Sequence, residues 1–96
     1  MSKLVLCHGV FDILHLGHIR HLQEARALGD RLVVSVTADE HVGKGSGRPH
    51  FSLLDRMEQL RGLACVDMVW ANGSGNAVEA IDHFKPAFYV KGIDYS

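Results

Sequence analysis

Short apolar runs alternate with longer amphipathic segments along the chain. We expect a strand in each of the apolar runs, at residues 3–8, 31–37, 66–71 and 87–90. The first run is almost continuously apolar, which is typical of a parallel strand that is covered on both faces. The segments between the runs repeat their apolar residues every three to four positions, as helices with one buried face do. We expect these helices at residues 17–28, 52–64 and 76–84.

The residues at the ends of the helices agree with this assignment. Gly29 is expected to end the first helix, a role for which glycine is common. Ser52 is followed three residues later by Asp55, which is a typical start of a helix. Pro86 would stop the third helix, because proline cannot continue a helical hydrogen-bond ladder.

Strands that alternate with helices indicate an α/β fold, a Rossmann-like parallel sheet. We expect one domain over residues 1–96, strand order 3-2-1-4 and helices on both faces. Ligands bind such sheets at the carboxyl ends of the strands. The chemically unusual segments follow predicted strands, at residues 8–18, 39–50 and 91–95.

Residues 9–18, with the sequence GVFDILHLGH, contain the most informative motif. His15 and His18 stand at the start of the first predicted helix, with Gly17 between them. The backbone N–H groups and the dipole of a helix start attract anions, and two imidazole donors would add to that attraction. Gly9 would let the backbone approach a ligand closely. The segment therefore predicts a phosphate-binding junction.

The motif resembles the HxGH signature of the cytidylyltransferase-like nucleotidyltransferase superfamily, in which a GxFD element precedes the histidines. Further segments fall in the order of that superfamily, namely 44–49 (KGSGRP), 56–57 (RM), 66–67 (VD) and 91–95 (KGIDY). The chain resembles most the adenylyltransferase domain of bifunctional heptose-phosphate kinase/adenylyltransferases, and next glycerol-3-phosphate cytidylyltransferases. The latter typically have an arginine where this chain has Ala64, which weakens the second resemblance.

The resemblance implies a role for particular residues. His15 and His18 would stabilise charge on the α-phosphate, and Lys44 would pair with phosphates as a third catalytic residue. The nucleotide would be contacted by Gly9, Val10, Phe11, Gly17 and Asp94. Substrate or its phosphate would be held by Arg48 and Arg56.

The implied reaction is in-line attack of a sugar phosphate or polyol phosphate on the α-phosphorus of ATP or CTP, with pyrophosphate leaving. Positioning and electrostatics would supply the catalysis, and Mg²⁺ would bridge the phosphates. Members of the superfamily often dimerise, so a homodimer is kept open.

The superfamily also has a further strand and a serine/threonine-rich signature, and the chain stops at Ser96 before both. We therefore expect a domain that is incomplete at its C-terminus, either a fragment or one completed by a partner or a fused domain. The alternative is a truncated, non-catalytic nucleotide-binding or interaction domain. For the 96-residue chain itself we expect weak nucleotide binding and poor turnover.

Composition narrows the range of partners and cellular compartments that we expect for the chain. The net charge of −1 gives no global field for nucleic acid or anionic membranes, so neither is expected as a partner. No apolar stretch approaches the ~20 residues of a membrane span. Cys7 and Cys65 lie in apolar runs and are expected to be inert core thiols in a reducing compartment. We expect a cytoplasmic protein.

Other interpretations of single residues stay open. His15, His18 and His21 have a spacing that could present zinc ligands, but no carboxylate or cysteine completes the set, so we expect no protein-bound metal. His8 fits a structural role and a role in the site about equally. Arg56 could instead form an ordinary surface salt bridge. The dinucleotide-binding and P-loop fingerprints are both missing.

Overall fold

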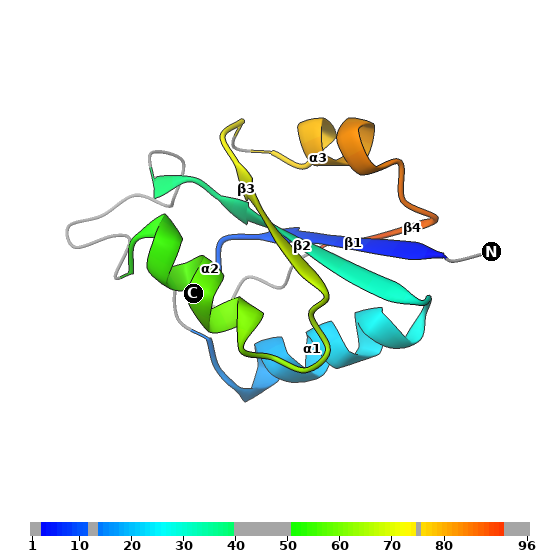
Figure 1. Cartoon of the computed structure of the whole chain (residues 1–96), viewed down its shortest axis with the longest axis horizontal. Coiled ribbons are helices and arrows are strands. Elements are labelled where there is room, and N and C mark those ends of the chain that lie inside the picture. The colour runs from blue at the N-terminus through cyan, green and yellow to red at the C-terminus, as the bar shows by residue number, and fades with distance from the viewer. Residues whose placement is uncertain (1–2, 12–13, 40–50, 75, 92–96) are drawn as a thin grey trace.

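The computed structural model describes residues 3–11, 14–39, 51–74 and 76–91 of the chain. Strands and helices alternate through this part, as expected (Figure 1). The elements are β1 (Leu4–Gly9), α1 (Leu16–Ala27), β2 (Arg31–Thr37), α2 (Leu53–Arg61), β3 (Met68–Asn72), α3 (Val78–Phe84) and β4 (Phe88–Lys91). Among the helices of the described ranges, none is long and apolar enough to cross a membrane.

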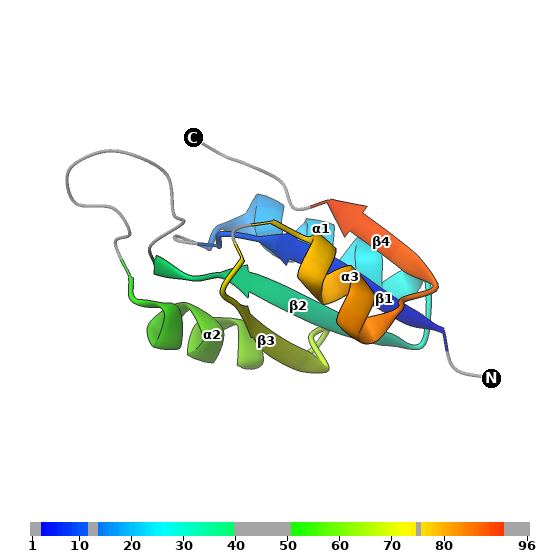
Figure 2. The ribbon, with the colours of Figure 1, turned by 90° about the horizontal axis from the view of Figure 1, so that it is seen from above.

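The strands form one parallel sheet in the order β3-β2-β1-β4, which confirms the predicted Rossmann-like topology. β1 lies in the interior of the sheet, and β3 and β4 lie at its two edges (Figure 2). Because all strands run the same way, their carboxyl ends meet at one edge of the sheet. The carboxyl ends of β2, β1 and β4 therefore lie side by side.

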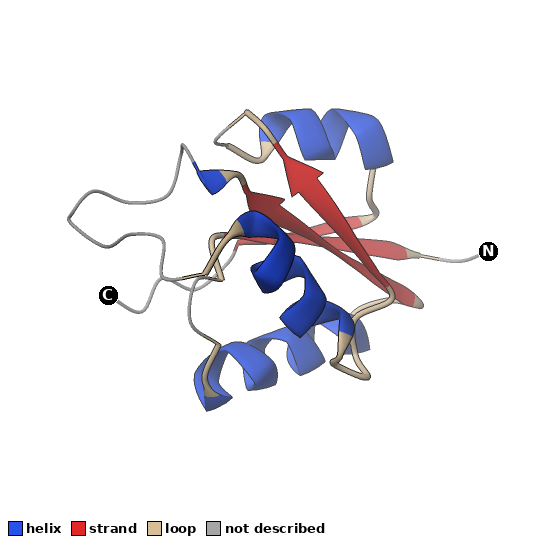
Figure 3. Cartoon of the chain, turned by 60° about the vertical axis from the view of Figure 1, so that its left-hand side comes forward, coloured by secondary structure: helices blue, strands red, loops and turns tan. Residues whose placement is uncertain are grey.

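The helices cover both faces of the sheet, with α1 and α2 on one face and α3 on the other (Figure 3). The larger core lies under α1 and α2 and contains Val5 and Cys7 of β1. The smaller core lies under α3 and contains Leu6. Side chains alternate between the faces of a strand, so burial on both faces explains why the first run is almost wholly apolar.

The second helix is shorter than its apolar pattern predicts. Ser52 caps it as expected, with its Oγ accepting a hydrogen bond from the Asp55 N–H at 3.3 Å. The helix ends at Arg61, because Gly62 takes the C-cap position and donates its N–H to carbonyls of the last turn. The chain then turns, and β3 begins at Met68, two residues later than expected.

Gly29 follows the first helix for a different reason from the expected one. The C-cap is Leu28 in a right-handed conformation, and this side chain is half exposed where the pattern placed it on the buried face. A Cβ atom on Gly29 would lie 2.5 Å from the Lys3 carbonyl oxygen and 2.9 Å from a methyl of Val5. The glycine therefore permits close packing of this turn against the start of β1.

Candidate functional site

The carboxyl edge of the sheet brings many of the predicted site residues together. Gly9 ends β1, and α1 begins at Leu16 with His15 as its N-cap. Gly9 pairs with Val36 near the end of β2. Lys44, Arg48 and Asp94 lie outside the described residues, so their roles stay predictions.

His15 and His18 cap the first helix reciprocally. The Nδ1 atom of His15 accepts a hydrogen bond from the Gly17 N–H at 3.0 Å, and the Nδ1 atom of His18 accepts one from the His15 N–H at 3.3 Å. The two ring centroids are 4.3 Å apart. His15 is exposed, whereas His18 is buried with its ring edge against Phe11. The spacing of three residues thus builds a capping box from two imidazoles.

This cap fixes the tautomer of both rings. A backbone N–H can only donate, so each Nδ1 atom must keep its lone pair, and the hydrogen of each neutral ring lies on Nε2. Both rings can therefore offer an Nε2–H donor without carrying a positive charge.

The donors of the junction differ from those that the sequence indicated. The N–H groups of the helix start were expected to form the phosphate cradle together with the imidazoles. The Gly17 N–H is instead donated to His15. The backbone of the first turn thus orients the ring, and the ring presents the donor. Direct contact of Gly17 with a nucleotide stays a prediction.

Phe11 has a strained backbone between β1 and α1. Its φ angle is +52°, a left-handed value that is rare for a bulky residue, and its side chain is only 4% exposed. A Cβ atom on Gly9 would lie 2.9 Å from the Phe11 ring. Gly9 is therefore needed to seat this ring, where the sequence indicated close approach of a ligand. The buried ring leaves backbone atoms as the groups that Phe11 can offer to a ligand.

Arg56 is fully buried and contacts four residues from three separate segments of the chain. It donates from Nη1 to the carbonyls of Val10 at 2.8 Å and Thr37 at 2.7 Å. Its Nη2 atom lies 2.6 Å from the Asp39 carboxylate, and its Nε donates to the Phe51 carbonyl at 3.1 Å. The interpretation as a surface salt bridge is wrong, because the guanidinium lies inside the molecule.

The hydrogen bonds of Arg56 connect the segments that surround the candidate site. Its partners precede and follow residues 40–50, the segment that contains Lys44 and Arg48. The Val10 carbonyl belongs to the segment between β1 and α1. One signal for burial was in the sequence: Arg56 precedes Met57 and stands four residues before Leu60, on the apolar face of its helix.

His21 fastens the first helix to the end of β4. Its Nε2 atom lies 2.9 Å from the Lys91 carbonyl oxygen, just before the segment with Asp94. This contact was not foreseen from the sequence, which indicated a surface or packing residue. Within the described ranges, no group of three histidine, cysteine, aspartate or glutamate side chains could hold a metal ion. The zinc interpretation of the three histidines therefore gains no support.

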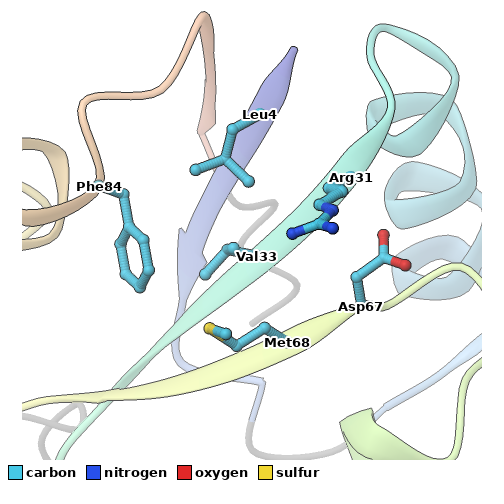
Figure 4. A pocket seen from close by; sticks show the side chains of 6 residues that line it. All are labelled: Leu4, Arg31, Val33, Asp67, Met68 and Phe84. Atoms are coloured by element: carbon cyan, nitrogen blue, oxygen red, sulfur yellow. The ribbon is translucent and has the colours of Figure 1, made fainter. Parts of the chain in front are cut away.

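A pocket of about 390 Å³ lies on the α3 face of the sheet, at the amino ends of the strands and thus opposite the carboxyl ends that carry the candidate site. Leu4, Arg31 and Met68 line it, and they are the first residues of β1, β2 and β3. Figure 4 shows Phe84 on one side of this pocket and Arg31 with Asp67 on the other. The pocket is thus remote from the histidines and does not form part of the candidate site.

Comparison with known proteins identifies the family of the chain. The model of the family described as cytidylyltransferase-like matches residues 6–95. The chain belongs to the cytidylyltransferase-like family. The reciprocal histidine cap and the strained Phe11 are thus features of a cytidylyltransferase-like domain.

Individual relatives support the assignment. The bifunctional protein HldE of Pseudomonas savastanoi pv. phaseolicola is 48% identical over 96 residues, which make up 98% of this chain and 20% of the relative. HldE of Pseudomonas putida (strain F1) is 46% identical with the same coverage. The chain thus spans about a fifth of the length of these curated relatives.

A solved structure resembles this cytidylyltransferase-like chain closely. It is the crystal structure of the lipopolysaccharide core biosynthesis protein from Thermoplasma volcanium, which superposes with a TM-score of 0.80 at 34% sequence identity. The likeness covers 93% of this chain and 73% of that one. The predicted resemblance and the predicted fold are both confirmed.

Proposed function

We propose that the chain carries the nucleotidyl-transfer site of an enzyme that joins a nucleoside triphosphate to a sugar phosphate or polyol phosphate and releases pyrophosphate. The observation that carries the proposal is the reciprocal cap of His15 and His18, which gives both rings an Nε2–H donor at the carboxyl edge of the sheet. Membership of the cytidylyltransferase-like family supports the reaction class.

In the proposed step, a phosphate oxygen of the acceptor attacks the α-phosphorus in line. The bond from the α-phosphorus to the bridging oxygen breaks, and that oxygen leaves with pyrophosphate. Negative charge grows on the α-phosphate oxygens, where the Nε2–H groups of His15 and His18 would donate hydrogen bonds. Donors that are already oriented cost little reorganisation at the moment of reaction.

We propose that the nucleotide is used as its Mg²⁺ complex. Mg²⁺ usually keeps several waters and is held largely by the substrate phosphates, so the nucleotide itself would bring the ion into the site. The Asp39 carboxylate, although half exposed, is engaged by Arg56. We propose that Lys44 and Arg48 contribute the positive charge that phosphates require.

For the substrates we propose ATP and a phosphorylated sugar. The identity to bifunctional HldE proteins and the structural likeness to a lipopolysaccharide core biosynthesis protein support this choice over CTP and glycerol phosphate. The sequence supports it as well, because Ala64 stands where the glycerol-phosphate enzymes typically have an arginine.

The test uses the full-length protein with Mg²⁺ and either ATP or CTP. We expect ATP to raise the melting temperature more than CTP does, because a ligand that binds only the folded state stabilises it. With a sugar phosphate present, we expect pyrophosphate release that falls about 10²–10³-fold in His15→Ala and His18→Ala. His83→Ala is the matched control, since this exposed histidine of α3 lies on the other face of the sheet.

Two outcomes would contradict the proposal. Full pyrophosphate release by either site variant would remove the assigned role of the histidines. Stabilisation by nucleotide without pyrophosphate release from any sugar phosphate or polyol phosphate would favour a non-catalytic nucleotide-binding domain.

A further inference from the structure

A row of hydrogen-bonded side chains crosses the carboxyl end of the sheet on the face that α3 covers. It joins Asn72 of β3, Ser35 of β2 and His8 of β1. Ser35 and Asn72 are fully buried, and His8 is half-buried. An apolar residue at position 8 would continue the pattern of Leu6 two residues earlier on the same face. The polar row therefore needs a reason beyond packing.

The direction of each hydrogen bond can be worked out from one end. The Thr37 hydroxyl donates to the Gly9 carbonyl at 3.2 Å, so its oxygen can only accept from His8 Nε2 at 3.4 Å. A neutral His8 ring with its hydrogen on Nε2 accepts at Nδ1, which lies 2.9 Å from the Ser35 hydroxyl. Ser35 then accepts from the Asn72 amide at 3.0 Å. Donors and acceptors match along the whole row.

The row ends on the backbone of the candidate site. The Gly9 carbonyl immediately precedes Val10 and Phe11. Both residues are predicted to contact the nucleotide, and Phe11 has the strained φ angle. Arg56 of α2 holds the Val10 carbonyl at 2.8 Å. This backbone is thus fixed by one side chain from the α2 side and by the polar row from the α3 side.

We propose that His8 is a positioning residue of the nucleotidyl-transfer site: acting through Thr37, it fixes the Gly9 carbonyl and with it the backbone of Val10 and Phe11. The catalytic consequence of this inference rests on the proposed function, whereas the positioning of the backbone by His8 and Thr37 does not. Burial lowers the pKa of His8 from its ordinary value of 6.5, which favours the neutral ring that the row requires.

Replacing His8 by an amide side chain separates the hydrogen bond of Nδ1 from that of Nε2. In His8→Gln the amide nitrogen can take the place of Nε2 and donate to Thr37. In His8→Asn the shorter amide can serve Ser35 in place of Nδ1 but does not reach Thr37. Thr37→Val removes the last link while keeping the shape of the side chain. None of these variants changes a residue assigned to contact substrate.

In the full-length protein, we expect His8→Asn and Thr37→Val each to raise the KM for ATP about tenfold, with kcat changed less than about twofold, because backbone contacts to nucleotide are misaligned. His8→Gln should restore the KM to within about threefold of the wild type, and the His8→Asn/Thr37→Val double variant should be no worse than either single variant. Val33→Ala is the stability control, because it shortens a buried side chain on the same face of β2 outside the row.

A nucleotide-free measurement tests the structural part alone. Nitrogen-15 NMR of the full-length protein should show the His8 hydrogen on Nε2, and Thr37→Val should shift the amide resonances of Val10 and Phe11. A hydrogen on Nδ1, unshifted amides, or equal KM values for His8→Gln and His8→Asn would overturn the inference. If the wild type makes no pyrophosphate but the NMR results are as expected, the proposed function fails and the positioning by His8 stands.

Discussion

At the scale of single residues, the histidines of the first helix serve local structure and proposed chemistry with different atoms. The Nδ1 atoms hold the helix start, and the Nε2–H groups are the proposed donors to phosphate. The sequence predicted the two residues and their spacing, but it could not show the tautomer. That property depends on which backbone N–H group points at each ring.

A replacement of His15 by asparagine separates these two tasks. Asparagine is a good N-cap, so we expect His15→Asn to keep the free energy of unfolding within about 0.5 kcal/mol, whereas His15→Ala loses about 1 kcal/mol. Both variants lack the Nε2–H donor and should lose turnover equally, by about 10²–10³-fold. Urea denaturation measures the free energy of unfolding of each variant, and pyrophosphate release measures its turnover. An active asparagine variant would show that the ring donates nothing to the reaction.

Gly9 is predicted to be intolerant of a single methyl group. In Gly9→Ala the new Cβ would clash with the buried Phe11 ring at 2.9 Å, and we expect a loss of about 1–3 kcal/mol in the free energy of unfolding. Phe11→Leu/Gly9→Ala should recover part of that loss, since the smaller side chain leaves room. Gly73→Ala is the control, because nothing lies within 4 Å of a Cβ at that glycine. Equal effects of Gly9→Ala and Gly73→Ala would contradict the packing argument.

The two cysteines should differ in reactivity. Burial raises the pKa of Cys7 to about 12, so its reactive thiolate is scarce at pH 8. Cys65 is partly exposed, and its pKa is also raised by burial. With an aromatic disulfide reagent at pH 8 we expect slow labelling of Cys65 and labelling of Cys7 only after unfolding. Comparison with Cys65→Ser assigns the two rates, and rapid labelling of Cys7 in that folded variant would contradict its burial.

At the scale of elements, the apolar patterns predicted which segments are strands and helices, and the errors lie at their ends. The second helix stops at Arg61 because Gly62 closes it, although the apolar pattern continues to Ala64. Leu28 matches the apolar spacing of the first helix but lies at its C-cap and is half exposed. A periodic pattern counts positions, whereas a helix end is decided by local hydrogen bonds and by neighbouring elements.

At the same scale, Arg56 joins α2 to the ends of β1 and β2. Removing it in Arg56→Met would leave the buried Thr37 carbonyl and the partly buried Val10 carbonyl without their donor, and we expect a loss of about 2–5 kcal/mol. Asp39→Asn should cost no more than about 1 kcal/mol, because that side chain is half exposed and the backbone contacts of Arg56 persist. Chemical denaturation of both variants measures the difference. Similar losses in the two would mean that the ion pair outweighs the contacts to backbone.

At the scale of the whole molecule, stability should depend on pH through His8. The pKa of this ring is lowered by burial in the folded state, so below about pH 6.5 the unfolded chain binds more protons than the folded one. The free energy of unfolding should therefore fall as the pH drops below about 6.5. Lys91 of the adjacent strand is paired with His8 in the sheet register, and a positive charge at that position does not favour protonation of the ring.

The variant His8→Gln isolates this contribution from that of the other histidines. Denaturation at pH 7.5 and 5.5 should show a smaller loss of stability in the variant than in the wild type. A parallel decline in both proteins would mean that His8 takes up its proton equally well when folded.

The sequence also predicted that the described candidate residues meet at the carboxyl ends of the strands, because parallel strands end on the same side of the sheet. It did not predict the supports: Arg56, His21 and the row from Asn72 to Thr37 act on backbone carbonyls of other elements. Such contacts join residues far apart in the chain. No local pattern encodes them, and they were accessible only once the register of the strands was known.

The Arg56 contacts have a consequence for changes in the connection between Asp39 and Phe51. One guanidinium pins Thr37 and Asp39 on one side of residues 40–50 and Phe51 on the other, so the framework does not rely on that segment to bring its own ends together. A change in the length of the connection between Asp39 and Phe51 should therefore cost the fold little. A replacement of this connection by that of a relative, with Arg56 retained, is expected to leave the free energy of unfolding within about 1 kcal/mol of the wild-type value.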